Sequence, residues 1–354
     1  MRRITKLATV ASVVALVLAS AGCAKKNTDS PSAGGGSGDN CAKKDAEKMV
    51  GMAFDVGGRG DQSFNDSAAA GLDKAACEFG VTAKTSEATD GEAESAREGR
   101  LREFADAGFN PIVGVGFAYS SSVTKVAKEY PKVNFAIIDD EVAQADNITN
   151  LVFAEEQGSY LVGAAAALKS QKDYVGFVGG VETPLIQKFQ AGFEAGAKAA
   201  KPDIKIDVRY LTQPPDFSGF GDPAKGKTAA EGMYDKGADV VYHAAGGSGG
   251  GVFEAAKAAN AKAIGVDSDQ AKTADPSVRD VIITSMVKKV DVAVYEYLKA
   301  DDGGDTPTGV TRYDLKADGV GYSTTGGQVD DIKSQLEDYK SKIVDGEIKV
   351  SATP

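Results

Sequence analysis

The sequence predicts an α/β protein of two lobes, each built on a mostly parallel sheet with helices on both faces. The chain has 354 residues, which is more than one hydrophobic core usually accommodates. From residue 48 onward, short apolar runs typical of buried strands alternate with longer stretches of helical period. The 42 glycines suit the many tight turns that this alternation requires.

The first 22 residues have the features of an export signal. Three basic residues precede an apolar run at 7–18, which is shorter than the stretch that a membrane-spanning helix needs. Small residues at 20–22 then lead to Cys23, and the segment resembles a bacterial lipoprotein signal, although Ser20 stands where an aliphatic residue is usual. The resemblance implies cleavage after residue 22 and diacylation of Cys23. The alternative is an ordinary signal peptide that is cut elsewhere.

A polar segment at 23–47 separates this signal from the folded part. It contains Lys, Asn, Ser, Pro and a run of glycines, which predicts a flexible tether with nothing to bury. If Cys23 carries lipid, Cys41 and Cys77 are left as a pair outside the cytoplasm, where a disulfide between them is possible. The alternative is two separate thiols, because the sequence does not give their distance.

In the first half of the folded part, the runs predict strands and helices in strict alternation. The expected strands are 49–54, 81–85, 111–115 and 133–138, and the expected helices are 65–79, 92–107 and 121–129. Asp61 or Ser63 can cap the first of these helices.

The alternation is resumed in the second half. The expected strands are 174–178, 204–211, 239–243, 262–266, 281–286 and 310–313, and the expected helices are 156–168, 185–200, 223–237, 251–260, 290–300 and 329–344. The helix at 223 should begin with Asp222 as its cap and Pro223 at its first position. We expect one lobe from 48–153 plus about 284–308, and the other from 154–283 plus about 309–354.

Ligands of open parallel sheets bind at the carboxyl ends of the strands, so the segments after each strand are the informative ones. They and the neighbouring motifs read DVGG (55–58), SFN (63–65), GVGF (114–117), VGFVGG (175–180), DPAKGK (222–227), HAAGGSG (243–249), GVDSDQ (265–270) and SMVK (285–288). In this order they resemble the basic membrane protein family, whose members are lipoprotein substrate-binding components of ABC importers and include receptors for purine nucleosides. The resemblance covers the chain from about residue 48 to its end.

This resemblance implies a type I periplasmic-binding-protein fold, with two Rossmann-like lobes, a hinge of three crossovers and a ligand cleft between the lobes. It also implies roles for individual residues. Asp55, Asp267 and Lys288 would hold ribose hydroxyls, and Gly246 would allow close approach of the backbone. The remaining implied ligand residues are two rings that sandwich the base and an amide that bonds its edge: Phe64, Phe220 and Asn65. The chemistry suits a nucleoside, because aromatic faces stack on a base and carboxylates accept from hydroxyls.

Two positions depart from the family pattern. Nucleoside receptors of the family carry an acidic residue after Gly-Phe, where this chain has Tyr119, Ser120 and Ser121. We expect Ser121, or the tyrosine, to bond the base instead. An apparent insertion before Phe220 leaves Phe217 as an alternative stacking ring.

Composition excludes several functions. A formal net charge of −11 argues against nucleic acid as a partner. One histidine and no Cys-x-x-Cys argue against a metal site, and we expect no cofactor. The sequence thus predicts a monomeric, lipid-anchored receptor on the extracytoplasmic face of the cell membrane that binds a nucleoside and docks on an ABC permease, and not an enzyme. The alternatives are a ligand sensor for a membrane kinase and a nucleoside hydrolase.

Overall fold

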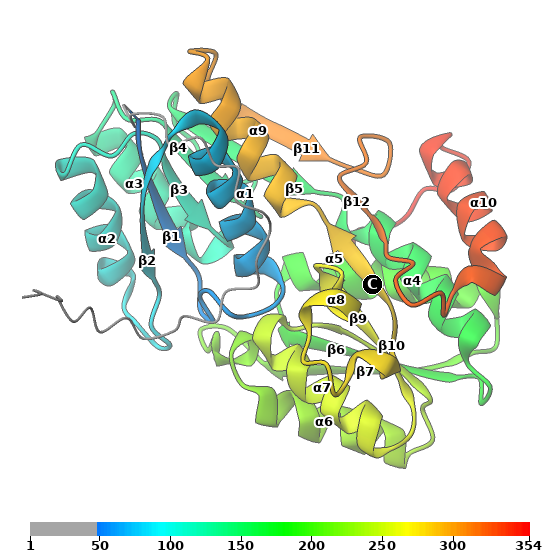
Figure 1. Ribbon diagram of the computed structural model, residues 1–354. Helices are drawn as coiled ribbons and strands as arrows, with labels where there is room; N and C mark the ends of the chain where they lie inside the picture. Colours follow the sequence, from blue (N-terminus) through cyan, green and yellow to red (C-terminus); the bar gives the residue numbers. More distant parts are fainter. Residues whose placement is uncertain (1–47) are drawn as a thin grey trace, which may run out of the picture. The chain divides into compact units, whose positions relative to one another are not determined.

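The computed structural model describes residues 48–354 (Figure 1). The signal at 1–22, the lipidation of Cys23, the tether at 23–47 and Cys41 lie outside the described residues and stay predictions. Cys77, on the first helix, is disulfide-bonded, and its pairing with Cys41 also stays a prediction. No helix within residues 48–354 has both the length and the apolar character needed to cross a membrane.

The described residues form two six-stranded sheets, which confirms the predicted α/β class. All strand pairs of the first sheet are parallel, in the order β11-β5-β4-β3-β1-β2. Its strands are β1 (Met49–Phe54), β2 (Thr82–Glu87), β3 (Ile112–Val115), β4 (Phe135–Ile138), β5 (Ile148–Phe153) and β11 (Gly309–Tyr313).

The second sheet has the order β12-β10-β9-β8-β6-β7, in which β12 runs antiparallel to β10 and the other pairs are parallel. Its strands are β6 (Tyr174–Val181), β7 (Lys205–Thr212), β8 (Val240–Ala244), β9 (Lys262–Asp267), β10 (Ile282–Lys288) and β12 (Val320–Tyr322).

Helices cover both faces of each sheet, because both faces of the central strands are apolar (Figure 1). The helices of the first sheet are α1 (Phe64–Phe79), α2 (Glu94–Asp106), α3 (Ser120–Glu129) and α9 (Val290–Asp302). Those of the second are α4 (Glu155–Lys169), α5 (Pro184–Ala200), α6 (Pro223–Asp235), α7 (Gly249–Ala258), α8 (Gln270–Thr273) and α10 (Lys333–Val344). In β1, Val50, Met52 and Phe54 pack toward α1 and α9, whereas Ala53 packs toward α2 and α3.

Two strands were not expected from the sequence. The run that forms β5 is interrupted by Thr149 and Asn150, which hid its strand character. In the structure both side chains are buried and bonded: the Thr149 hydroxyl donates to the carbonyl of Pro307, and the Asn150 amide donates to that of Ala143 at 3.0 Å. Polar residues with such partners are compatible with a fully buried strand. The other unexpected strand, β12, has only three residues.

The pairing of strands shows where the chain passes between the sheets. It leaves the first sheet after β5, returns after β10, and leaves again after β11. We expected the last two passages near 283 and 308, but β10 remains in the second sheet to Lys288, and β11 pairs with β5 up to Tyr313. Strand pairing does not assign every residue to a lobe, so the division into lobes itself stays a prediction.

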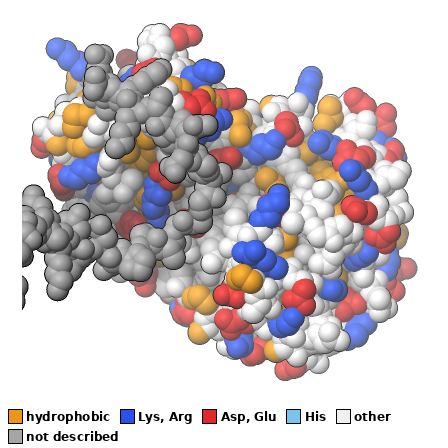
Figure 2. Space-filling view, in the orientation of Figure 1, with side chains coloured by type: hydrophobic (Ala, Val, Ile, Leu, Met, Phe, Trp, Pro, Cys, Tyr) orange, Lys and Arg blue, Asp and Glu red, His pale blue; other side chains and the backbone are white. Residues whose placement is uncertain are grey.

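The surface of the described residues is mixed in charge. On the face shown in Figure 2, Lys and Arg side chains are interspersed with Asp and Glu. The negative net charge is therefore not gathered into one patch on that face.

Candidate ligand-binding cleft

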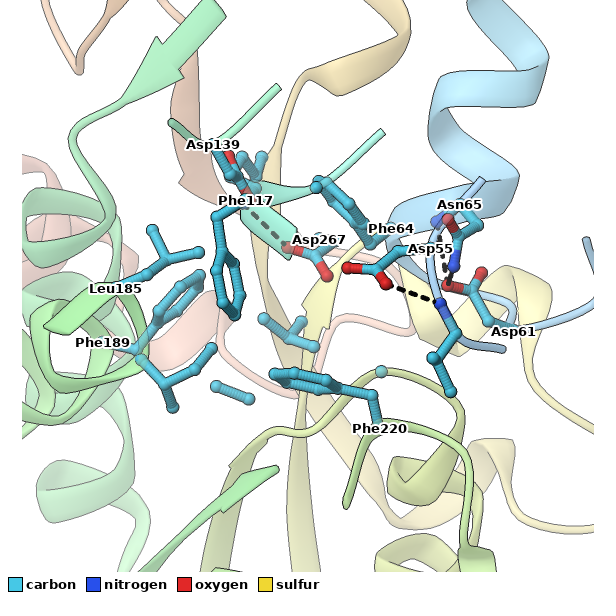
Figure 3. Close-up of a pocket in the computed structure, with 17 residues that line it drawn as sticks. Asp55, Asp61, Phe64, Asn65, Phe117, Asp139, Leu185, Phe189, Phe220 and Asp267 are labelled. Atoms are coloured by element: carbon cyan, nitrogen blue, oxygen red, sulfur yellow. Dashed lines mark hydrogen bonds and ion pairs between the residues drawn. The ribbon is translucent and has the colours of Figure 1, made fainter. Parts of the chain in front are cut away.

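A cavity lies where strand ends of the two sheets face each other (Figure 3). Its empty volume is about 550 Å³, including the part of its mouth that opens to solvent. It is lined by residues that follow β1, β3, β4, β7 and β8, by the ends of β8, β9 and β10, and by the beginnings of α1 and α5: Asp55, Val56, Asp61, Phe64, Asn65, Gly116, Phe117, Asp139, Leu185, Ile186, Phe189, Phe220, Ala244, Gly246, Val266, Asp267 and Lys288. This is the position at which open α/β sheets bind ligands.

The structure brings together nearly all of the residues that the sequence singled out. Those that line the cavity are Asp55, Phe64, Asn65, Phe220, Gly246, Asp267 and Lys288. They come from segments more than 200 residues apart, so only the fold unites them. Their contact with a ligand stays a prediction.

Ser121 does not line this cavity. It is exposed in the first turn of α3, where its hydroxyl donates to Glu94. Tyr119 is fully buried and points elsewhere: its hydroxyl donates to the carbonyl of Phe54 at 3.1 Å and accepts from Arg100 at 2.9 Å. The neighbouring residue that does line the cavity is Phe117.

Asp55 follows β1 directly and is only 8% exposed. Its Oδ1 accepts a hydrogen bond of 2.8 Å from the N–H of Val56. Burial raises the pKa of Asp55 to about 6, although the Val56 N–H and Arg97 act in the opposite direction. Gly116 makes room for this carboxylate, because a Cβ atom there would lie 2.5 Å from Asp55 Oδ2.

Aromatic rings form part of the cavity wall. Phe117 and Phe220 lie edge to face, with ring centroids 6.5 Å apart. Phe217 packs on Phe117 at 5.8 Å but is not among the lining residues, whereas Phe220 is. Stacking of either ring on a ligand stays a prediction. Apolar side chains at the start of α5, Leu185 and Phe189, face these rings (Figure 3).

Lys288 is almost completely buried, at 2% exposure, and lies among three carboxyl groups. Its Nζ atom is 2.6 Å from Asp139 Oδ2, 3.6 Å from Glu155 Oε1 and 3.9 Å from Asp267 Oδ1. Burial alone would lower the pKa of Lys288, but the three carboxyl groups together raise it above its usual value. The lysine is therefore charged, and its ammonium group lies 4.8 Å from the centre of the Phe64 ring.

The carboxyl groups around this lysine retain unused acceptor atoms. Asp139 Oδ1, Asp267 Oδ1 and both carboxyl oxygens of Glu155 are buried without a hydrogen-bond partner. Burial raises the pKa of Glu155, which lies at the first position of α4, and that of Asp267. The unused oxygens of Asp139 and Asp267 belong to residues that line the cavity, so a ligand with hydroxyl or N–H groups would find acceptors there.

Asp267 also joins the two sheets. Its Oδ2 accepts from the hydroxyl of Ser63 at 2.8 Å, and the hydroxyl of Ser268 donates to the Ser63 carbonyl at 3.0 Å. Ser63 precedes α1, whereas Asp267 ends β9. The loop after β1 and the end of β9 are thus held together beside the cavity.

Sequence reasoning overlooked several lining residues for which a signal existed. Asp139 follows the expected strand 133–138, and Phe117 follows Gly116 after the strand 111–115, so the strand-end rule applied to both. Leu185 and Phe189 are four residues apart at the start of a helix and therefore share one face. From the sequence alone, these two apolar side chains cannot be distinguished from ordinary core residues.

The site offers binding groups rather than a metal centre. Within residues 48–354, no group of three His, Cys, Asp or Glu side chains is placed to hold a metal ion. The polar lining is rich in acceptors, and its charged donor is Lys288. Together with the aromatic wall, this arrangement suits a compact, neutral ligand with several hydroxyl or N–H donors.

Comparison with known proteins places these observations in a family. The family described as ABC transporter substrate-binding protein, PnrA-like (Bmp), matches residues 48–353. The chain is 34% identical to the ABC transporter nucleoside-binding protein BmpA of Lactococcus lactis, over 96% of this chain and 98% of that protein. It is 38% identical to the CD4+ T-cell-stimulating antigen of Listeria innocua, over 90% and 91% of the two chains.

A solved structure agrees with this assignment. The solute-binding protein of an ABC transporter system from Aeropyrum pernix superimposes with a TM-score of 0.75 at 31% identity, covering 87% of this chain and 94% of that one. The predicted type I periplasmic-binding fold is thereby confirmed. The chain belongs to the Bmp family of PnrA-like ABC transporter substrate-binding proteins.

Proposed function

We propose that this ABC transporter substrate-binding protein serves an importer, is anchored by lipid on the extracytoplasmic face of the membrane, and binds purine nucleosides in the cleft between its sheets. The observation that carries the choice of ligand is the combination of an aromatic wall with buried acceptors and one charged lysine. The Lactococcus relative is named as nucleoside-binding, which supports the same ligand class.

In this proposal the ribose lies at the end of the cavity near Asp55, Asp267 and Lys288. The carboxylates accept from its hydroxyl groups, and the lysine donates to them. Asp55 follows a strand of the first sheet and Asp267 ends a strand of the second, so a ligand between them is contacted from both sides. Contacts from both sides favour the closed arrangement of the lobes, which is the form that would dock on the permease.

The base would lie against the aromatic wall. Phe64 and Phe220 both line the cavity and would stack on the base, with Phe117 packed edge to face against Phe220. Ser121 is not included in the proposed ligand set, because its hydroxyl is bonded to Glu94 outside the cavity.

The charges of the cavity also predict which compounds related to nucleosides do not bind well. A nucleoside monophosphate would bring negative charge close to Asp55, Asp139 and Asp267, with Lys288 as the lining cation. Unpaired charges of like sign in a buried site are strongly unfavourable. We therefore expect nucleosides to bind and their 5′-phosphates to bind at least about a hundredfold more weakly.

A thermal-shift panel tests this selectivity. Purine nucleosides should raise the melting temperature, whereas free ribose, 2′-deoxynucleosides and nucleoside 5′-phosphates should raise it less at equal concentration. Ser121→Ala is the matched control and should leave the pattern unchanged. Equal shifts with adenosine and its monophosphate would contradict the proposed ligand class.

The lipid anchor has its own test. Cells that express the protein should incorporate labelled palmitate into it, and the label should disappear in Cys23→Ser while the protein is still exported. Retention of the label in this variant would place the modification elsewhere.

A further inference from the structure

A buried carboxylate, Asp61, holds the end of the loop that leads into α1. Four N–H groups donate to it. Its Oδ1 accepts from the backbone N–H of Ser63 at 2.9 Å and of Asp66 at 3.1 Å. Its Oδ2 accepts from the backbone N–H of Asn65 at 2.8 Å and from the side-chain Nδ2 of the same residue at 3.1 Å. Of the two capping residues expected from the sequence, Asp61 and Ser63, it is therefore the Asp61 side chain that caps α1.

The contact with Nδ2 determines which way the Asn65 amide lies. An ionised carboxylate accepts hydrogen bonds and donates none, so it must face the NH₂ side of the amide and not its oxygen. Burial raises the pKa of Asp61 to about 6, against the effect of the N–H groups of Asn65, Ser63 and Asp66, so the carboxylate is mostly ionised at neutral pH. In the reverse orientation two acceptor oxygens would face each other.

This leaves the amide oxygen of Asn65 without a partner. Asn65 is 3% exposed and lines the cavity, and its Oδ1 is a buried acceptor with no hydrogen bond. Figure 3 shows the Asn65 and Asp61 side chains next to each other at the edge of the cavity, on the side away from Leu185 and Phe189. A buried acceptor of this kind is unfavourable until something donates to it.

We propose that Asp61 is a positioning residue that fixes Asn65 as a hydrogen-bond acceptor, so that the cleft selects ligands presenting an N–H or O–H donor at that point. Without Asp61, the Asn65 amide could turn either its NH₂ group or its oxygen toward the cavity. The Asp61 carboxylate binds the NH₂ group, so only the oxygen is left to face a ligand. This proposal rests on the proposed function for the ligand class. For purine nucleosides, the selected donor is an exocyclic amino group or a ring N–H of the base.

The prediction can be tested with ligand pairs that differ by one donor. Adenosine is compared with purine riboside, which lacks the amino group, and inosine with 1-methylinosine, which lacks the ring N–H. In the unaltered protein at about pH 7.5, at least one donor-bearing ligand should bind about tenfold or more tightly than its partner, because a site built around a hydrogen bond rejects the ligand that leaves it unmade.

Asp61→Asn changes the chemistry while it keeps the shape. Its amide oxygen can still accept from the backbone N–H groups of Ser63 and Asp66, whereas its NH₂ group, in the place of Oδ2, gives up the bond from the backbone N–H of Asn65. This NH₂ group can now face the side-chain oxygen of Asn65, so that the Asn65 amide turns and presents a donor to the cavity. The preference for the donor-bearing ligand should fall at least about fivefold, with little loss for the donor-lacking one. An equal loss of affinity for both members of each pair would mean that Asp61 acts only as a helix cap, and would overturn the proposal.

A second measurement covers the case in which Asp61→Asn does not fold or no nucleoside binds. In the unaltered, unliganded full chain, the side-chain NH₂ resonances of Asn65, identified by their loss in Asn65→Ser, should be protected from exchange with solvent. Rapid exchange would show that the amide is not held by Asp61 and would refute the inference. If no nucleoside binds while the NH₂ is protected, the proposed ligand class fails and the role of Asp61 stands.

Discussion

The buried charge of Asp55 should lower the stability of the unliganded fold while it serves ligand binding. The substitution Asp55→Asn separates these two consequences. The substitution removes the charge, keeps the shape and leaves an oxygen that can accept from Val56. In the unliganded protein the carboxylate is 8% exposed and its one hydrogen bond comes from a single backbone N–H. Removing the charge should therefore stabilise the fold at neutral pH and weaken the binding of ligand.

The magnitude follows from the pKa. Burial raises the pKa of Asp55 from 3.8 to about 6, and each pKa unit corresponds to about 1.4 kcal/mol. The charged form is thus disfavoured in the folded state by about 3 kcal/mol at pH 7, as an upper value. The folded state binds more protons than the unfolded chain between these two pKa values, so this destabilisation is complete above about pH 6 and disappears as the pH falls toward 4.

Urea unfolding of the unaltered protein and of Asp55→Asn at several pH values measures this difference. The variant should be more stable by about 1–3 kcal/mol near pH 7, and the two should converge near pH 4. Asp146→Asn, at an exposed aspartate between β4 and β5, is the matched control and should not raise the free energy of unfolding at pH 7. A variant that is less stable at pH 7, or a difference that does not change with pH, would refute this reasoning.

Three further substitutions test other parts of the structure. Lys288→Met leaves Asp139 buried without its ion-pair partner and should lower the free energy of unfolding, measured with urea, by about 3–5 kcal/mol. The double variant Lys288→Met, Asp139→Asn should regain part of this loss. Gly116→Ala places a Cβ atom 2.5 Å from Asp55 Oδ2 and should weaken ligand binding by about tenfold or more in calorimetry, whereas Gly108→Ala, at a similar positive φ with open space around it, should leave affinity unchanged. Gly99→Ala, in the interior of α2 with nothing near its Cβ position, should raise the free energy of unfolding by about 0.5–1 kcal/mol; a decrease would contradict the open space seen there.

Local sequence rules were sufficient for most of the architecture. The alternation of apolar runs with helical periodicity predicted the two mostly parallel sheets, because both faces of each sheet are covered and the central strands are largely apolar. The Asp222 cap and Pro223 at the start of α6 are confirmed: the Asp222 side chain accepts from the N–H of Lys225. The strand β5 was missed because its polar residues find buried partners that only the fold provides.

The site was predictable where residue type and strand end coincide, and not where orientation matters. Asp55, Asp267 and Lys288 combine polar character with a strand end, and the structure places all three around one cavity. Tyr119 and Ser121 also lie near a strand end, but the turn after β3 directs Tyr119 into the core and leaves Ser121 on the surface. Neither direction can be read from local sequence.

Charge networks across the two sheets were also invisible in the sequence. The ion pair between Lys288 and Asp139 joins residues 149 positions apart, and Glu155 joins it from the start of α4. Each of these residues by itself is typical of a solvated surface. Their burial around one point is a property of the packed sheets, and it is what gives the cavity its acceptors.

The most direct test of the account is calorimetric titration of adenosine, inosine and guanosine into the purified protein, side by side with Asp267→Asn. The account predicts saturable binding of at least one purine nucleoside, weakened at least about tenfold in the variant, because the carboxylate that accepts from the ribose is gone. No heat with any of the three nucleosides, or equal affinity in the variant, would contradict it.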